Sequence, residues 1–168
     1  MDFKINKEYP EIKVERKNKY YAQLLLDDYA SDASEDTSIH QYIYQSFDLF
    51  DKYPDIAKPL ARIAMVEMKH LELLGKTIKA LGVEPKFIYV DAKKRYYTYW
   101  NSSSVDYAVK LHDMLVSDIE LEKKAIRSYQ KHIDMIDDKY IKVLLKRIIE
   151  DELIHIRCFN KLIAMINK

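Results

Sequence analysis

The chain has 168 residues, of which 48% are hydrophobic and 33% are charged, so it is long and apolar enough to fold around one sizeable core. Its formal net charge is +1, which excludes a global electrostatic attraction to nucleic acid or to an anionic membrane. The only glycines are Gly75 and Gly82, so the glycine-rich loops of dinucleotide-binding and P-loop proteins are excluded as well.

The single cysteine, Cys158, excludes a disulfide framework and a four-cysteine metal centre. The charged N-terminus lacks the apolar centre of a signal peptide, and no run of about 18 apolar residues is long enough for a transmembrane helix. We therefore expect a cytoplasmic protein that has neither a membrane nor nucleic acid as a partner.

In chain order, the charged residues 1–18 predict an N-terminal arm. Residues at helical spacing predict a first helix over residues 19–51, which we expect Pro54 to end because proline cannot continue the hydrogen-bond ladder. A second helix is expected to begin at Asp55, as its N-cap, and to finish at Gly82, which suits the left-handed position after a helix.

Residues 83–101 contain Pro85 and many aromatic side chains, and they predict a long connection. A third helix is expected after the serines at 102–104, and a fourth after Asp137 or Asp138, again as an N-cap. Short links make each helix pair an antiparallel hairpin, and the long connection is a crossover between the hairpins. The sequence therefore predicts one all-α domain over residues 1–168, a four-helix bundle of two antiparallel hairpins joined by a long crossover.

Polar residues interrupt the inward-facing stripes of all four helices in a pattern that repeats between the two halves. Both halves read Arg-Ile-x-x-x-Glu-x-x-His, over residues 62–70 and 147–155. In each half a further inward glutamate comes before the motif, 32 residues before the motif's glutamate in the first half and 30 in the second. Seven residues after this further glutamate, and therefore on the same helix face, each half has a tyrosine. The residues of this repeat are Glu35, Tyr42, Glu67, His70, Glu122, Tyr129, Glu152 and His155.

Four ionised carboxylates in one layer of an apolar core are prohibitively costly unless they are neutralised. Two divalent cations would supply the four positive charges that balance them. Mixed carboxylate and imidazole ligands suit Fe, Mn, Zn or Co, and they do not suit Ca. The sequence therefore predicts a two-metal layer across the bundle, with a metal-free polar network as the alternative.

This arrangement resembles the di-metal carboxylate proteins of the ferritin-like superfamily, in their rubrerythrin and manganese-catalase-like branch. The resemblance covers most of residues 20–166 and is carried by residues 34–37 with 41–45, 66–75, 122–126 with Tyr129, and 151–155. It implies a ferritin-like bundle with two metal ions, Fe or Mn, as the cofactor. The metal ligands that it implies, called the six candidate ligands below, are Glu35, Glu67, His70, Glu122, Glu152 and His155.

The resemblance leaves the reaction open. In the manganese catalase pattern the glutamate of the last helix can stand off the metal, so Glu152 is either a ligand or a catalytic base. Rubrerythrins also have a four-cysteine iron site that supplies electrons, and a chain with one cysteine needs an external electron donor for a peroxidase reaction. We expect redox chemistry on hydrogen peroxide, either catalase-like or peroxidase-like. The alternatives are a ferroxidase and a metal-binding structural protein without turnover.

Other polar residues are expected to lie near this layer. Tyr42 and Tyr129 either donate hydrogen bonds to the ligand carboxylates or are ordinary core aromatic residues. Asp28, on the inward stripe of the first helix, either lines an access path or marks a helix end. His132 has no carboxylate partner at convincing spacing, and we expect no special role for it.

One further acid is expected to orient a ligand. Asp151 can accept a hydrogen bond from the outer nitrogen of His70 across the bundle. The equivalent position in the first half holds Val66, so His155 needs a different partner.

Residues 93–100 mix basic and aromatic side chains, a combination that can bind single-stranded nucleic acid. Because a crossover lies flat on helices and the net charge is near zero, we favour packing or a contact with a second copy of the chain. The expected partners are a small-molecule substrate (hydrogen peroxide or dioxygen), an external electron donor and further copies in a homo-oligomer.

Overall fold

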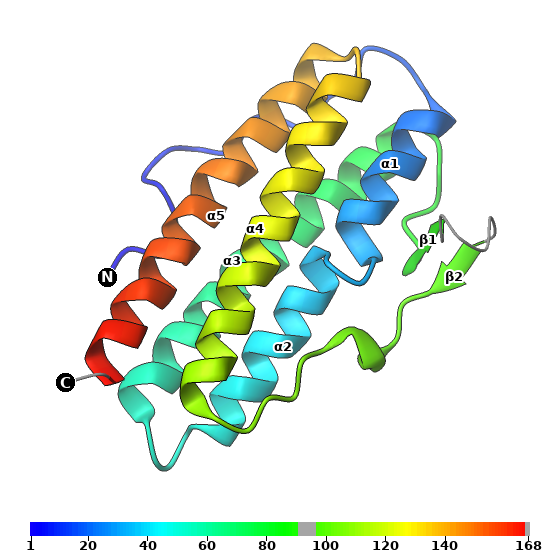
Figure 1. Cartoon of the computed structure of the whole chain (residues 1–168). Helices are drawn as coiled ribbons and strands as arrows, with labels where there is room; N and C mark the ends of the chain where they lie inside the picture. Colours follow the sequence, from blue (N-terminus) through cyan, green and yellow to red (C-terminus); the bar gives the residue numbers. More distant parts are fainter. Residues whose placement is uncertain (91–96, 167–168) are drawn as a thin grey trace.

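The computed structural model describes residues 1–90 and 97–166 (Figure 1). Its elements are α1 Lys19–Ala30, α2 Glu35–Asp48, α3 Pro54–Ala80, β1 Ile88–Val90, β2 Tyr97–Tyr99, a 3-10 helix Ser102–Ser104, α4 Leu111–Met135 and α5 Lys139–Ile166. Among these described residues, no helix combines the length and the apolar character that a membrane crossing requires.

The helices form a four-helix bundle in which α1 and α2 follow one another along one rod, beside α3, α4 and α5 (Figure 1). Helix α2 packs mainly against α3, and α4 packs mainly against α5. Only residues 49–53 and 136–138 link these partners, so each pair is an antiparallel hairpin. The described residues between α3 and α4, 81–90 and 97–110, lie along the outside of the bundle (Figure 1). The predicted all-α bundle of two hairpins and a crossover is confirmed.

The rod predicted as one helix over residues 19–51 is two helices, separated at residues 31–34. The Ser34 side chain caps α2 by accepting a hydrogen bond from the N–H of Thr37. The hydroxyl groups of Ser34 and Thr37 donate to the carbonyl oxygen of Ser31, at 2.7 and 2.9 Å. Such local side-chain bonds compete with helical backbone bonds, so the prediction of one helix is wrong. The break places Glu35 in the first turn of α2.

Two other helix starts differ from the prediction. Pro54 is a first-turn residue of α3, where its missing N–H forfeits no helical bond, and it does not end the preceding helix. The N-cap position of α3 is Tyr53 and not Asp55. The serines at 102–104 form the 3-10 helix, and α4 begins only at Leu111.

Two predicted helix boundaries are confirmed, the start of α5 at Asp138 and the end of α3 at Gly82. Asp138 caps α5, since its Oδ1 accepts hydrogen bonds from the N–H groups of Tyr140 and Ile141, at 3.0 and 3.2 Å. Gly82 follows α3 with a φ of 91°, in the left-handed region that favours glycine.

The crossover contains an unpredicted antiparallel pair, β1 with β2, and its aromatic residues pack on the bundle. The Trp100 indole donates to Thr37 Oγ1 at 2.8 Å and lies over His40, with ring centroids 4.5 Å apart. Phe87 stacks on Tyr29 at 5.2 Å between centroids. At this end of the basic and aromatic run, packing is therefore confirmed, whereas residues 93–96 lie outside the described residues.

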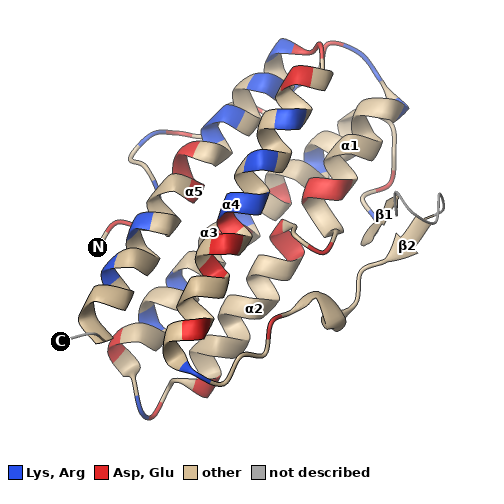
Figure 2. Ribbon diagram, in the orientation of Figure 1, with Lys and Arg blue, Asp and Glu red and all other residues tan. Residues whose placement is uncertain are grey.

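The apolar core is divided into two clusters along the bundle axis. One cluster lies around Leu25, Leu74 and Leu145, and the other lies around Leu60 and Phe159. Figure 2 shows acidic residues at the mid-height of the bundle, on α2, α3 and α4. A buried polar layer therefore separates two apolar ones, and it is this layer that holds the candidate site.

Candidate metal centre

All six candidate ligands meet in this layer, and none of them is more than 3% exposed. Helix α2 contributes Glu35, α4 contributes Glu122, and α3 and α5 each contribute a glutamate and a histidine one turn apart. The structure thus brings together, from four different helices, the residues that the repeat singled out.

The six side chains form two overlapping groups of four. The first group is Glu35, Glu67, His70 and Glu152, and the second is Glu67, Glu122, Glu152 and His155. Within each group, one ligand atom per residue lies within 4.8 Å of all the others. Glu67 and Glu152 belong to both groups, so the geometry offers two adjacent positions with two shared carboxylates.

Each histidine directs its Nδ1 atom at three carboxylates. His70 Nδ1 lies 2.9 Å from Glu67 Oε2, 3.1 Å from Glu152 Oε1 and 3.6 Å from Glu35 Oε2.

His155 repeats the arrangement in the other half. Its Nδ1 lies 2.8 Å from Glu67 Oε1, 2.9 Å from Glu152 Oε2 and 3.4 Å from Glu122 Oε1. One ring N–H can satisfy one of three acceptors, and among the described residues Oε1 of Glu67 and Oε1 of Glu152 have no hydrogen-bond donor. Buried, crowded oxygens of this kind fit a pair of divalent cations. Carboxylate and imidazole groups are suitable ligands, and the charges of two such cations balance those of four carboxylates.

Burial and crowding also shift the pKa values of the glutamates and histidines in this cluster. Burial, followed by repulsion from Glu152, raises the pKa of Glu67 well above its usual value and that of Glu122 to about 7. Burial alone would lower the pKa of His70, yet the carboxylates of Glu152 and Glu35 raise it well above its usual value. The protein by itself therefore keeps protons on this layer, which bound cations would displace.

Each tyrosine of the repeat reaches the glutamate of the opposite half. The Tyr42 hydroxyl donates to Glu122 Oε1 at 2.7 Å, and the Tyr129 hydroxyl donates to Glu35 Oε1. Both tyrosines are almost fully buried. The Tyr129 bond leaves Glu35 Oε2 facing His70, whereas Glu122 Oε1 both accepts from Tyr42 and faces His155.

Asp151 lies against the outer nitrogen of His70, where the sequence predicted it, with 3.2 Å between Asp151 Oδ2 and His70 Nε2. For His155 the corresponding atom is Nε2, which lies 2.9 Å from the main-chain oxygen of Phe3. Sequence reasoning left this partner open, because a carbonyl oxygen in an unpatterned arm leaves no side-chain signal.

Two buried acids outside the six candidate ligands have partners that sequence reasoning missed. Asp28 accepts from the Ser128 hydroxyl at 2.6 Å and lies 2.7 Å from His132 Nδ1, so the expectation that His132 lacks a carboxylate partner is wrong. The two residues come from different helices, and sequence spacing does not show such a pair.

The other buried acid is Asp118, one turn before Glu122 on α4. Its Oδ1 accepts hydrogen bonds from the amides of Gln41 and Gln45, both at 2.8 Å. Among the described residues, Asp118 Oδ2 and Gln45 Oε1 have no partner, and burial raises the pKa of Asp118 to about 8. The four-residue spacing to Glu122 was a signal that could have found this acid.

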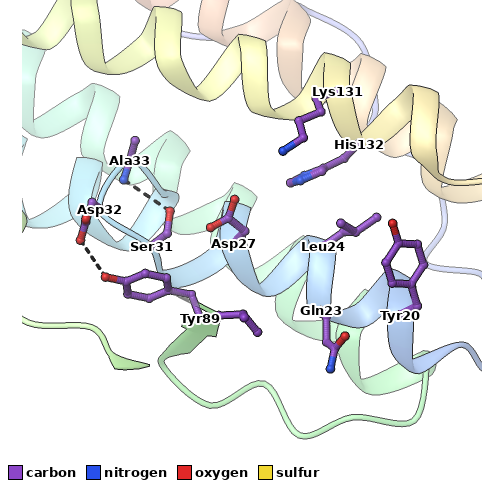
Figure 3. Close-up of a pocket in the computed structure, with 11 residues that line it drawn as sticks. Tyr20, Gln23, Leu24, Asp27, Ser31, Asp32, Ala33, Tyr89, Lys131 and His132 are labelled. Atoms are coloured by element: carbon purple, nitrogen blue, oxygen red, sulfur yellow. Dashed lines mark hydrogen bonds between the residues drawn. The ribbon is translucent and has the colours of Figure 1, made fainter. Parts of the chain in front are cut away.

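A surface pocket of about 610 Å³ lies beside the break between α1 and α2 (Figure 3). Its lining includes Asp27, Lys131 and His132, and at its edge the Tyr89 hydroxyl donates to Asp32 at 3.1 Å. None of the six candidate ligands lines this pocket, so it is distinct from the candidate metal centre.

The fold and the site together define a di-metal carboxylate protein of the ferritin-like type. The family model for rubrerythrin matches residues 30–163. The chain belongs to the rubrerythrin family, and the resemblance seen in the sequence is confirmed. A comparison with curated protein sequences finds no significant match.

Solved structures give the same fold. The manganese catalase KatB from Anabaena superposes with a TM-score of 0.84 at 24% identity, covering 98% of this chain and 81% of that chain. The bacterioferritin of Desulfovibrio desulfuricans, whose crystal structure describes a diiron site, gives 0.70 at 26% identity, covering 88% and 80%. Mycobacterium tuberculosis bacterioferritin BfrA gives 0.74 at 20% identity, covering 90% and 89%.

Proposed function

We propose that this chain is a di-metal redox protein that degrades hydrogen peroxide, with Mn or Fe held by the six candidate ligands. The observation that carries the proposal is the pair of overlapping groups that share Glu67 and Glu152. In this assignment one position takes Glu35 and His70, and the other takes Glu122 and His155. Glu67 and Glu152 would contribute to both positions, since they belong to both groups.

Redox metals held there would supply the two-electron chemistry of peroxide disproportionation, which balances as 2 H₂O₂ → 2 H₂O + O₂. The protein's own task is then to hold the ligands and to move protons. The hydroxyls of Tyr42 and Tyr129 fix the unshared glutamates. The apolar clusters above and below the layer limit access by water.

Glu152 is proposed as the catalytic proton carrier in addition to its role as a ligand. Its buried carboxylate belongs to both groups of four, so it would lie next to a small molecule bound at either position. Its carboxylate would hold one of the two protons released by the first peroxide until the second peroxide takes it up.

The catalase reaction is favoured over the peroxidase reaction because the former needs no electron donor. The single cysteine cannot build a second iron site that would supply electrons. The structural likeness to KatB, described as a manganese catalase, supports the same reaction.

A ferroxidase that oxidises Fe(II) with dioxygen or peroxide is the second candidate. It is favoured by the likeness to the Desulfovibrio desulfuricans bacterioferritin, whose description refers to a diiron site in different catalytic states.

One set of assays separates these functions. We expect protein purified from its native host to contain two Mn or Fe per chain and to release dioxygen from peroxide without a reductant. Peroxide loss only with an added electron donor would replace the catalase with a peroxidase. Fe(II) oxidation without peroxide turnover would favour the ferroxidase, and a redox-inert metal without turnover would overturn the redox proposal.

A further inference from the structure

The N-terminal arm, residues 1–18, lies along α5 (Figure 1). Residues 2–9 of the arm contact the outside of the buried polar layer that holds the candidate site. The buried Arg147 donates to the main-chain oxygens of Ile5 and Lys7, at 3.3 and 2.9 Å. Cys158 donates from Sγ to the main-chain oxygen of Asp2 at 3.2 Å. These contacts fix the main chain of the arm against the helix that carries Glu152 and His155.

The arm supplies the missing partner of His155. The first half of the repeat has the apolar Val66 where the second half has Asp151, so no side chain at that position can accept from His155 Nε2. The carbonyl oxygen of Phe3 lies 2.9 Å from this atom. A hydrogen bond from Nε2–H to Phe3 leaves the lone pair of Nδ1 directed at the carboxylates, which is the tautomer that a metal ligand needs.

The arm also holds the partner of His70. Asp151 Oδ2, 3.2 Å from His70 Nε2, accepts from the Tyr9 hydroxyl at 2.7 Å. Asp151 Oδ1 accepts from the Ile5 N–H at 2.7 Å and pairs with Arg147 Nη1 at 2.7 Å. Asp151 thus contacts four groups, which include His70. The others are Tyr9 and Ile5 of the arm, and Arg147, which itself donates hydrogen bonds to the arm.

We propose that residues 2–9 are positioning residues of the metal centre, which fix the outer nitrogens of both histidines and thereby set the affinity of both metal positions. The inference rests on the proposed ligand set and adds to it a segment of the chain that the repeat does not include. Outer partners of this kind are worth about 10–100-fold in metal affinity at well-studied sites.

The arm makes the two positions unequal. Loss of residues 2–9 removes the only hydrogen-bond partner that the described structure gives His155 Nε2, whereas His70 keeps Asp151. A change confined to Tyr9 affects the environment of His70 and leaves the Phe3 carbonyl in place. The two perturbations therefore act on different histidines.

Zn(II) is the probe, because it is redox-inert and suits the ligand set. Its affinity is measured by competition with a chelator, for the full chain and for a chain that lacks residues 2–9. We expect the full chain to bind two Zn(II), and the shortened chain to bind at least one of them about 10–100-fold more weakly. Circular dichroism checks that the shortened chain retains its helices.

A second variant keeps the test valid if the shortened chain does not fold. In Zn(II)-loaded protein labelled with ¹⁵N-histidine, Tyr9→Phe is expected to shift the Nε2–H signal of His70 and to leave that of His155 unchanged. Tyr20→Phe is the matched control, since it removes the hydroxyl of a half-exposed tyrosine remote from both histidines, and it is expected to change neither signal.

The outcomes separate this inference from the proposed function. A folded chain without residues 2–9 that binds two Zn(II) with full affinity would overturn the role of the arm, as would an unchanged His70 signal in Tyr9→Phe. Two Zn(II) sites that depend on the arm, in a protein with no redox turnover when loaded with Mn or Fe, would support the arm and refute the redox function.

Discussion

Asp118→Asn should stabilise the metal-free protein at neutral pH and have much less effect in acid. Burial raises the pKa of Asp118 from 3.8 to about 8, so the folded protein retains a proton that the unfolded chain has released. The contribution of Asp118 to the stability of the folded protein is therefore greatest below pH 3.8. It falls as the pH rises from 3.8 to about 8, above which Asp118 is ionised in the folded and the unfolded state alike.

The size of the effect follows from the shift. One pKa unit corresponds to about 1.4 kcal/mol, so raising the pH from 3.8 to 7 costs the wild type about 4 kcal/mol as an upper bound. Asparagine does not titrate, and its Oδ1 can accept the same amide hydrogen bonds.

The assay is urea unfolding of chelator-treated protein at pH 5.0 and at pH 7.5. Asp134→Asn, which changes an exposed acid on the same helix, is the control and should alter stability little at either pH. The reasoning is refuted if Asp118→Asn changes stability equally at both values, or if it destabilises the protein at pH 7.5.

Three further predictions concern the site and the fold. Glu67→Gln or His155→Ala should lose most bound metal, measured by elemental analysis after gel filtration, and two metals per chain in both variants would refute the ligand assignment. Gly82→Ala should lower the free energy of unfolding by about 1–2 kcal/mol, since alanine is strained at a φ of 91°, and an unchanged urea midpoint would contradict this. Leu145→Ala, at a fully buried position, should cost about 2–5 kcal/mol by the same assay, and a loss below about 1 kcal/mol would mean that the core is not packed there.

The parts of the fold that were predictable from the sequence depend on short-range patterns. Helical spacing indicates the bundle, and Asp138 and Gly82 mark helix ends because caps act over a few residues. The break at 31–34 escaped prediction because serine is tolerated in a helix and caps one only when its side chain turns back to the backbone, as Ser34 does.

The candidate site was predictable because its residues violate the apolar pattern twice, at matching positions of two helices. Their outer partners were less predictable. Asp151 was found through its place in the repeat, whereas the Phe3 carbonyl and the pair of Asp28 with His132 depend on how distant segments meet. Main-chain acceptors and contacts between helices leave no periodic signal in the sequence.

The central claim is that four glutamates and two histidines are tolerated at one level of the core because two cations lie among them. A crystal of Mn- or Fe-loaded protein, measured at the absorption edge of that metal, tests this directly. The account predicts two anomalous peaks in the layer, one beside His70 and one beside His155, with Glu67 and Glu152 in contact with both. A map without peaks there, or with the six side chains turned away from a common centre, would contradict it.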